Sequence, residues 1–195
     1  MMQIALLLAI AYLLGAIPTG LIVGKLLFNK DIRKFGSGNL GATNTFRVLG
    51  KKAGTFVTIF DVAKGVLPAI FPIIFDLDIH GIWFGLAAII GHVYPIYLKF
   101  RGGKAVATSA GVILGVNPLI FLIIAVIFFT LLFTTRMVSL TSILTSIGNF
   151  ITTLFFDDII LKIISFLIML IIIIRHSSNI RRIISGTEPK IQFKK

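Results

Sequence analysis

Long apolar stretches alternate with short polar ones along the whole chain. A helix needs about 20 residues to cross a hydrocarbon layer of about 30 Å, and seven stretches reach or approach that length. They cover residues 3–24, 54–75, 81–98, 105–118, 119–133, 138–155 and 159–174. No internal repeat of fixed period stands out. The pattern predicts an all-α, polytopic membrane bundle of about seven transmembrane helices, forming a single domain over residues 1–195.

Three of these stretches carry unusual features. The first contains Pro18 between glycines at 15 and 20, which predicts a kink or an unwound turn. The second carries Asp61 and Lys64, which are costly at that depth and are either functional or a mutually neutralising pair. The stretch 105–118 is short and only moderately apolar. A five-span arrangement, with this segment in the membrane interface, therefore stays open.

Composition agrees with the pattern. Hydrophobic residues make up 57% of the chain, charged residues make up 13%, and the mean hydropathy is +1.04, which is typical of integral membrane proteins. The absence of cysteine excludes disulfides, thiolate metal sites and cysteine nucleophiles. The three histidines show no metal-binding spacing, so we predict neither a metal nor a cofactor. The first stretch lacks a basic segment before it and reads as a retained helix.

The distribution of charge predicts the orientation. Basic residues gather after the first, third and fifth stretches and in the tail that ends on Lys194 and Lys195, whereas the other side carries Asp76, Asp78, Asp157 and Asp158. By the positive-inside rule the basic side is cytoplasmic, so the N-terminus lies outside and the C-terminus is cytoplasmic. The net charge of +12 is explained by topology and anionic membrane lipids, so no nucleic-acid partner is expected.

A glycine-rich polar stretch, residues 36–44, lies on the cytoplasmic side. Its glycines, Gly36, Gly38 and Gly41, let backbone N–H groups approach an anion closely. Neutral hydrogen-bonding side chains and flanking cations accompany them: Ser37, Asn39, Thr43 and Asn44, with Lys34 and Arg47. It is not a Walker loop, because Ala42 stands where that motif requires lysine. The stretch predicts a phosphate cradle, with a plain turn between helices as the alternative.

Two further polar stretches fall on the same side and can converge with the first. Gly102 and Gly103 precede Lys104, an arrangement expected to aim backbone N–H groups, a helix N-terminus and an ammonium at one anion. A lysine that only marks topology or snorkels is the alternative. In the tail, His176 and Asn179 share a face if a helix begins there.

Other polar residues accept two interpretations. His92, at a helix end, is either a structural or a catalytic histidine. Ser139 and Ser142 share a face at the cytoplasmic start of the sixth stretch, where bonding between helices is the alternative role.

Two catalytic signatures are missing from the sequence. There is no Gly-x-Ser-x-Gly elbow of a serine hydrolase. There is also no His-x4-Asp signature of the glycerolipid acyltransferases that use thioester donors, because the positions five residues after the histidines are Gly85, Tyr97 and Arg181.

Five motifs, in order, resemble the bacterial acyl-phosphate-dependent glycerol-3-phosphate acyltransferases. They are residues 36–44, Asp61-Val-Ala-Lys-Gly65, Gly91-His-Val-Tyr-Pro95 with the following residues 100–108, Arg136-Met-Val-Ser-Leu140, and residues 176–188. Ala105 departs from the glycine expected there, and we expect alanine to be tolerated because it is small and compatible with a helix.

The resemblance implies transfer of a fatty acyl group from acyl phosphate to the 1-hydroxyl of glycerol 3-phosphate. The products are 1-acylglycerol 3-phosphate, which is lysophosphatidic acid, and inorganic phosphate. It also implies a multi-pass protein of the bacterial cytoplasmic (inner) membrane, with membrane lipids around it and an active site that faces the cytoplasm.

Site residues follow from the same resemblance. Phosphate and substrate binding is expected from Gly36, Gly38, Asn39, Thr43, Asn44, Arg47, Lys64, Gly102, Gly103, Lys104, Ser139 and Ser142. Catalytic roles are expected for Ser37, His92, His176 and Asn179. The proton of the attacking hydroxyl goes to His176, to His92 or to the substrate's own phosphate.

A transporter for phosphate or an organophosphate is the competing hypothesis. An interrupted first helix and charges within a span are features of carriers. The lack of an internal repeat and the low polarity of the outer side argue against it.

Overall fold

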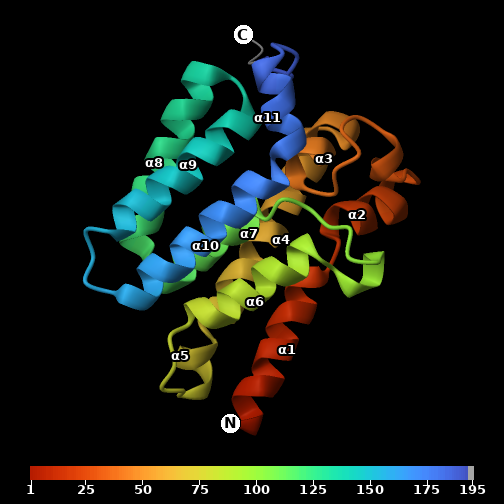
Figure 1. Cartoon of the computed structure of the whole chain (residues 1–195). Helices are drawn as coiled ribbons and strands as arrows, with labels where there is room; N and C mark the ends of the chain where they lie inside the picture. The colour runs from red at the N-terminus through yellow and green to blue at the C-terminus, as the bar shows by residue number, and fades with distance from the viewer. Residues whose placement is uncertain (193–195) are drawn as a thin grey trace. The chain divides into compact units, whose positions relative to one another are not determined.

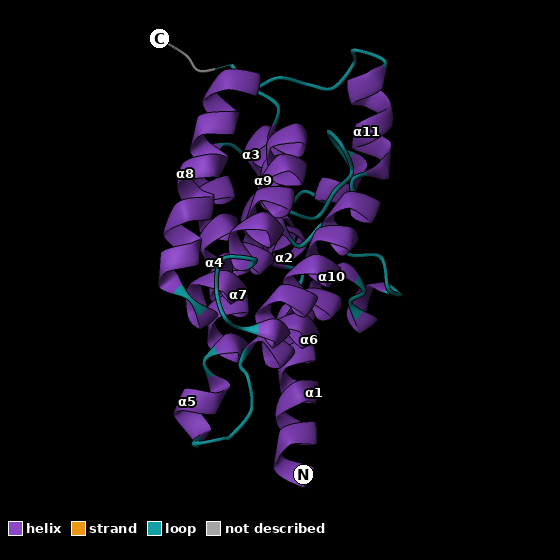
Figure 2. Cartoon of the chain, turned by 60° about the vertical axis from the view of Figure 1, so that its left-hand side comes forward, coloured by secondary structure: helices purple, strands orange, loops and turns teal. Residues whose placement is uncertain are grey.

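The structure is a computed structural model that describes residues 1–192. Within this range every regular element is helical and no strand is present (Figures 1 and 2). The all-α prediction is therefore confirmed. The chain divides into two compact units, residues 1–116 and the residues from 117 onward, so the single domain stays a prediction. The predicted cytoplasmic residues Lys194 and Lys195 lie outside the described part of the chain.

The first unit contains the broken first helix and the helices that follow it. Its elements are α1 (Met2–Ala16), α2 (Thr19–Phe28), the 3-10 turn η1 (Ile32–Lys34), α3 (Ala42–Leu49), α4 (Lys51–Ala69), α5 (Phe71–Phe75), α6 (Ile82–Val93), η2 (Ile96–Leu98) and α7 (Val106–Val116). The predicted interruption is confirmed, since α1 and α2 meet at an angle of 45°. Pro18 lies in the break, where it has no N–H to continue the helical hydrogen bonds.

Two helix pairs in the first unit cross at glycines, α1 with α6 and α4 with α7. At each crossing a glycine lies so close to a backbone carbonyl of the partner helix that a Cβ atom would not fit: Gly15 at Ala88 and Gly91 at Tyr12, then Gly65 at Thr108 and Gly111 at Val62. Small residues allow such close backbone approach in membrane helices. These crossings fix the helix ends that carry the polar loops of the unit.

Most of the weakly apolar segment 105–118 forms α7, which packs against α4 and α6. Its buried residues include Thr108 and Ser109 as well as Val112 and Ile113. Because protein surrounds much of this helix, it does not need the hydropathy of a segment that faces lipid. The moderate hydropathy is therefore explained by burial within the unit.

The second unit is built from α8 (Pro118–Thr135), α9 (Val138–Thr153), α10 (Ile159–Arg175) and α11 (Ser177–Ile184). α9 packs against both α8 and α10 (Figure 1). Side chains mark two of the starts: Asn117 Oδ1 accepts hydrogen bonds from the N–H groups of Leu119 and Ile120, and Asp158 Oδ1 accepts one from Leu161. These polar caps lie where the apolar pattern predicts the boundaries.

Among the described residues, α8 is the one helix that is long and apolar enough by itself to cross a membrane. Up to three spans result if the bent pairs α1–α2 and α10–α11, the latter bent by 60°, each count as one. The seven spans and their orientation stay predictions.

Candidate active site

The glycine-rich stretch of the first unit is a loop built around one buried side chain, Asn44. Asn44 is 1% exposed, and its Nδ2 donates to the carbonyls of Ile32, Phe35 and Asn39 at 3.0, 3.2 and 3.0 Å. Its Oδ1 accepts from the backbone N–H of Ser37 at 2.9 Å. The amide is thus used to shape the loop, and this geometry does not support the predicted direct contact of Asn44 with phosphate.

Glycine is required at two positions of this loop. Gly36 and Gly38 have φ of 62° and 69°, a left-handed conformation that favours glycine. A Cβ on Gly36 would also collide with Asn44 Oδ1. Asn39 adds a further turn, since its Oδ1 accepts from the N–H of Gly41 at 2.9 Å. The loop is therefore held in one shape before any ligand arrives.

A short helix, α3, begins within this stretch, at Ala42, and the sequence pattern did not indicate it. Gly41 occupies its N-cap position, and no side chain there accepts the first N–H groups. Thr43 and Arg47 are exposed and lie one helical turn apart on α3. Helix N-termini favour anions, so α3 presents N–H groups, a hydroxyl and a guanidinium near the loop.

The start of the loop carries an ion pair. Arg33 Nη2 lies 2.6 Å from Asp31 Oδ2, and Asp31 Oδ1 also accepts from the backbone N–H of Arg33. The side-chain hydrogen bond from Arg33 lowers the pKa of Asp31 to about 2. Asp31 thus stays ionised at neutral pH and does not repel an anion with an unpaired charge.

The second glycine stretch is arranged differently from the prediction. The N–H groups of Gly102 and Gly103 donate to the carbonyls of Val93 and His92, both at 3.0 Å, so they close the C-terminus of α6. The expectation that these N–H groups face an anion is wrong for this structure. Lys104 is partly buried, and α7 begins two residues later, at Val106.

His92 lies directly beneath this stretch. It is 9% exposed, its Nδ1 is 3.1 Å from the hydroxyl of Thr108, and a Cβ on Gly103 would collide with its Nε2. These contacts give His92 a supporting position under the glycines. Its predicted catalytic role stays a prediction.

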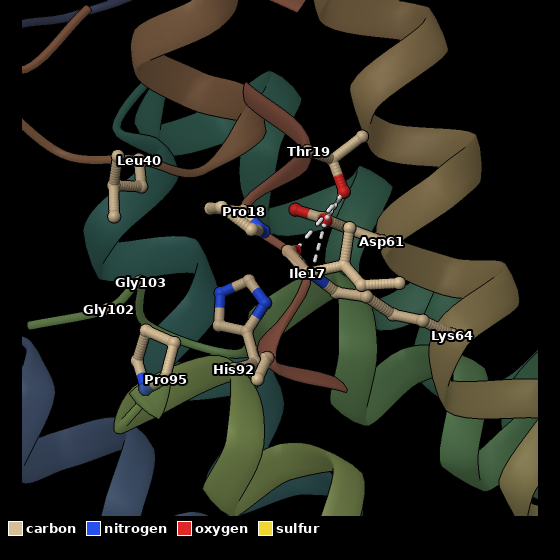
Figure 3. Close-up of a pocket in the computed structure, with 11 residues that line it drawn as sticks. Ile17, Pro18, Thr19, Leu40, Asp61, Lys64, His92, Pro95, Gly102 and Gly103 are labelled. Atoms are coloured by element: carbon tan, nitrogen blue, oxygen red, sulfur yellow. Dashed lines mark hydrogen bonds and ion pairs between the residues drawn. The ribbon is translucent and has the colours of Figure 1, made fainter. Parts of the chain in front are cut away.

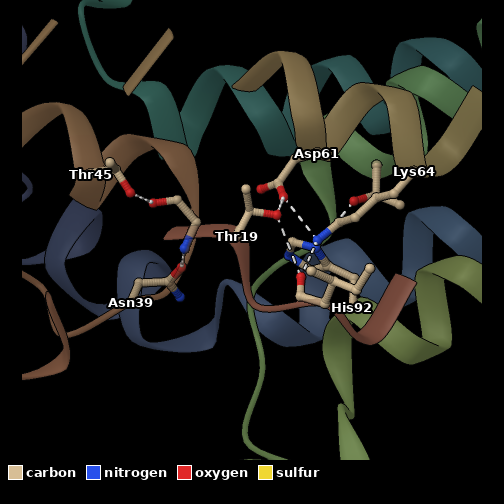
Figure 4. Close-up of polar contacts among 9 residues, drawn as sticks. Thr19, Asn39, Thr45, Asp61, Lys64 and His92 are labelled. Carbon is tan, nitrogen blue, oxygen red and sulfur yellow. Dashed lines mark hydrogen bonds and ion pairs between the residues drawn. The ribbon is translucent and has the colours of Figure 1, made fainter. Parts of the chain in front are cut away.

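The two charges on α4 form a buried pair at the break between α1 and α2. Lys64 Nζ lies 2.8 Å from Asp61 Oδ1 and donates to the carbonyl of Ile17 at 3.0 Å, while the hydroxyl of Thr19 donates to Asp61 Oδ1 at 3.2 Å (Figure 4). Beside them is a cavity of about 10 Å³, also lined by His92, with room for about one water molecule (Figure 3).

The second unit has a polar cluster that centres on Glu188. Glu188 Oε1 accepts from the hydroxyl of Ser139 and from Asn179 Nδ2, both at 2.7 Å, and Oε2 accepts from Arg182 Nε at 2.7 Å. Burial raises the pKa of Glu188, but these three hydrogen bonds and the charge of Arg182 outweigh it and leave the pKa below its ordinary value of 4.5. Glu188 is therefore an ionised hub.

Sequence reasoning did not assign a role to Glu188. Its partner Ser139 is 49 residues away, so no local spacing connects them. The available signal was composition, because Glu188 is the one glutamate of the chain and stands in a strongly basic tail.

His176 and Asn179 behave as expected from their spacing. Both are buried, at 3% and 7% exposure, whereas Ser177 and Ser178 between them are exposed. His176 Nδ1 lies 2.8 Å from the carbonyl of Ile172. A carbonyl only accepts, so Nδ1 carries a proton, and when the ring is neutral Nε2 is its acceptor nitrogen. Such a nitrogen is suited to receive a proton.

The hydroxyl of Ser142 donates to the carbonyl of Val138 at 2.8 Å, so its oxygen still has accepting capacity. Within residues 1–192, no group of three or more histidine or acidic side chains is placed to hold a metal ion.

Comparison with known proteins identifies the family. The family model described as glycerol-3-phosphate acyltransferase matches residues 5–186. A glycerol-3-phosphate acyltransferase of Macrococcus caseolyticus is 94% identical over 194 residues, covering 100% of both chains, and one of Staphylococcus aureus is 53% identical over 201 residues, covering 98% of this chain and 100% of the relative.

Solved structures agree with the sequence relatives. The crystal structure of PlsY, an integral membrane glycerol 3-phosphate acyltransferase, in its glycerol 3-phosphate form has a TM-score of 0.91 at 38% identity, covering 96% of this chain and 95% of that one. The lysophosphatidic acid form has a TM-score of 0.88 at 37% identity, with the same coverage. The chain belongs to the glycerol-3-phosphate acyltransferase family of integral membrane enzymes.

Proposed function

We propose that this enzyme transfers a fatty acyl group from acyl phosphate to the 1-hydroxyl of glycerol 3-phosphate. The hydroxyl oxygen forms a bond to the acyl carbon, the bond from that carbon to the phosphate oxygen breaks, and inorganic phosphate leaves. The hydroxyl proton passes to a base. The products are lysophosphatidic acid and phosphate.

The observation that carries this proposal is the preformed loop at residues 36–44. Both substrates present a phosphate, and the loop combines positive-φ glycines with an uncapped helix N-terminus and Arg47. Ser37, Asn39, Thr43, Arg47 and Lys104 are the proposed phosphate ligands. Gly36, Gly38 and Asn44 give the loop its shape, and Gly102 and Gly103 place Lys104.

The second unit supplies groups for the acceptor hydroxyl. His176 Nε2 is the first choice of base, since Nδ1 is oriented by the carbonyl of Ile172. Asn179 and Ser139, fixed by Glu188, and Ser142 are the proposed polar partners of glycerol 3-phosphate. The substrate's phosphate is the alternative base, and His92 is the third candidate.

An acyl phosphate is already activated, so the chemistry needs neither a covalent intermediate nor a metal. Orientation of two bound substrates contributes about 7 kcal/mol or more to lowering the barrier, and fixed donors stabilise the developing negative charge. We further propose that the enzyme lies in the bacterial inner membrane among lipids that take up its product, with its N-terminus outside and the active site facing the cytoplasm. The transporter hypothesis is not retained, because the family is one of acyltransferases.

The decisive experiment offers labelled glycerol 3-phosphate to purified enzyme with acyl phosphate, acyl-CoA or acyl-carrier protein, each alone. We expect lipid-extractable product with acyl phosphate only. Product formed with acyl-CoA or acyl-carrier protein but not with acyl phosphate would overturn the proposed donor.

Variants test the proposed ligands in the same assay. Lys104→Ala is expected to raise KM for glycerol 3-phosphate or to lower kcat, and a parent-like enzyme would remove Lys104 from the site. For the base, an unchanged pH profile and full activity in His176→Gln and in His92→Gln would favour the substrate's phosphate.

A further inference from the structure

We propose that Asp61 and Lys64 are positioning residues that hold the break between α1 and α2, on which both glycine-rich stretches of the first unit rest. This inference depends on the proposed phosphate-binding role of residues 36–44 and Lys104. It replaces the predicted direct contact of Lys64 with substrate.

The ion pair bridges the break itself. Lys64 donates to the carbonyl of Ile17, the residue before Pro18, and Asp61 accepts from the hydroxyl of Thr19, the residue after it (Figure 4). The side chains of Lys64 and Asp61 are only 8% and 4% exposed, and Lys64 Nζ lies 2.8 Å from Asp61 Oδ1. Two side chains of a single helix, α4, therefore form hydrogen bonds to the chain on both sides of the proline.

Lys64 is poorly placed to bind a substrate. Its ammonium has three donors, and the pair with Asp61 and the bond to Ile17 already use two of them. Together with the buried carboxylate of Asp61, the ammonium also forms a pair without net charge, which weakens its attraction for a phosphate. The contacts fit a support role.

The break is coupled to the loop at residues 36–44 through the next residue of α2. Gly20 approaches the carbonyl of Leu40 and lies so close to Thr45 Oγ1 that a Cβ would sit 2.9 Å from it. Thr45 Oγ1 in turn donates to the carbonyl of Gly41 at 3.2 Å (Figure 4). A shift of the first turn of α2 therefore moves the loop.

The other side of the break faces the second glycine stretch. The cavity of about 10 Å³ is lined by Ile17 and Pro18 from the break, by Gly102 and Gly103, and by His92 beside them (Figure 3). Because so little space separates these groups, a displaced break would press on the segment that places Lys104. The Asp61–Lys64 pair thus sets the position of both stretches together.

The pair predicts a pattern of rescue that a substrate ligand would not show. Removing one partner leaves a buried, uncompensated charge, whereas removing both leaves none. We expect Lys64→Met and Asp61→Asn each to raise KM for glycerol 3-phosphate by about tenfold or more, and the double variant to return to within about threefold of the parent. Lys52→Met, an exposed lysine of the same helix, and Asp78→Asn serve as matched controls and should keep the parental KM.

Kinetics should be measured on the monodisperse, folded fraction, so that lost protein does not appear as lost function. Thr19→Val provides a variant with the ion pair intact, and we expect a several-fold rise in KM from it because the hydroxyl that ties α2 to Asp61 is gone. A double variant as impaired as Lys64→Met would overturn the proposal in favour of a substrate contact. Parental KM in Thr19→Val and in both single variants would overturn it as well.

Lys104→Ala separates this inference from the proposed function. Its defect should persist when Asp61→Asn is added, since Lys104 is not part of the ion pair. If Lys104→Ala and Ser37→Ala keep parental kinetics, the phosphate-binding role of the two stretches fails. If those two variants are impaired while the Asp61 and Lys64 variants are not, the positioning role alone fails.

Discussion

At the scale of single residues, Glu188 organises the polar groups of the second unit. It joins Ser139 at the start of α9 to Asn179 and Arg182 on α11 through hydrogen bonds of 2.7 Å each. Two of these partners are proposed substrate ligands, so Glu188 affects the reaction through the positions of others. Its ionised state matters, because all three partners donate.

Replacing Glu188 by glutamine should therefore weaken the second unit. Hydrogen bonds to a charged group contribute about 1.5–3 kcal/mol, and we expect a loss of this order in the free energy of unfolding. The folded pKa lies below 4.5, so the carboxylate's contribution is present above pH 4.5 and is lost as the pH falls through the folded pKa. Thermal unfolding in detergent between pH 3 and 7 checks both points.

The informative quantity is the difference in stability between the parent and Glu188→Gln at each pH. Parent and Glu188→Gln should converge at the acidic end of the range and separate as the pH rises. A constant difference at every pH would contradict the role of the ionised carboxylate.

Ala105 has a backbone conformation that the sequence did not indicate. Its φ of 57° is not helical, and it lies just before α7, which begins at Val106. The residue is 1% exposed. We expected alanine to be tolerated because it is compatible with a helix, but this reason does not apply, since Ala105 is not helical. A left-handed alanine costs about 1–2 kcal/mol, which glycine avoids.

We expect Ala105→Gly to stabilise the protein slightly. The relief of strain is partly offset by the greater freedom of glycine in the unfolded chain, which leaves a net gain of up to ~1 kcal/mol. Ala107→Gly, which is inside α7, should instead destabilise by about 1 kcal/mol. Thermal unfolding of the two variants side by side tests the opposite signs, and equal shifts would argue against the strain.

At the scale of elements, the glycine crossings determine how tightly the helices pack. Gly111 of α7 lies against the carbonyl of Val62 on α4, where no Cβ atom fits. A methyl group there must push the two helices apart. Gly148 on α9 differs, because a Cβ would meet Ile127 at an ordinary 3.4 Å.

Gly111→Ala should consequently destabilise the protein by about 1–3 kcal/mol, the usual cost of overpacking. Gly148→Ala is its matched control and should be neutral or stabilising by up to ~1 kcal/mol, since alanine favours a helix. The midpoint of thermal unfolding of each variant tests this difference. Equal destabilisation by both would show that crowding at α4 and α7 is not the cause.

Several helix boundaries could be predicted because local chemistry marks them. Pro18 broke the first helix, and Asn117 and Asp158 capped α8 and α10 close to the expected positions. The short helix α3 was missed, since Gly41 at its N-cap gives no side-chain signal. The directions of the Gly102 and Gly103 N–H groups were also missed, because they depend on where α6 ends in space.

At the scale of the whole molecule, the lack of cysteine makes the proposed orientation easy to test. Single cysteines introduced one at a time at exposed positions report the side of the membrane without background labelling. We expect Asp78→Cys and Asp157→Cys to react in intact cells with a reagent that does not cross the membrane. Lys30→Cys and Lys190→Cys should react only after permeabilisation.

Two labelling results would contradict this topology. Labelling of Lys30→Cys in intact cells would reverse the predicted orientation. Labelling of Asp78→Cys and Lys30→Cys from the same side would remove the second span.

The family and the chemistry could be predicted from the sequence, while the division of labour among the polar residues could not. Motif residues such as Ser37 and His176 are recognisable by type and spacing. Whether a polar residue contacts substrate or supports a neighbour depends on tertiary partners, as Asn44 and Lys64 show. Glu188 depends on a contact across 49 residues and had no local signature.

The short helix α7 has a consequence for how the chain enters the bilayer during synthesis. Its 11 residues extend about 16 Å, roughly half of the hydrocarbon thickness, and they include Thr108 and Ser109. Such a segment partitions poorly into lipid from the translocon on its own. Since Gly65 and Gly111 pack it closely against α4, we expect this segment to enter the membrane together with its tertiary packing, after the helices made before it.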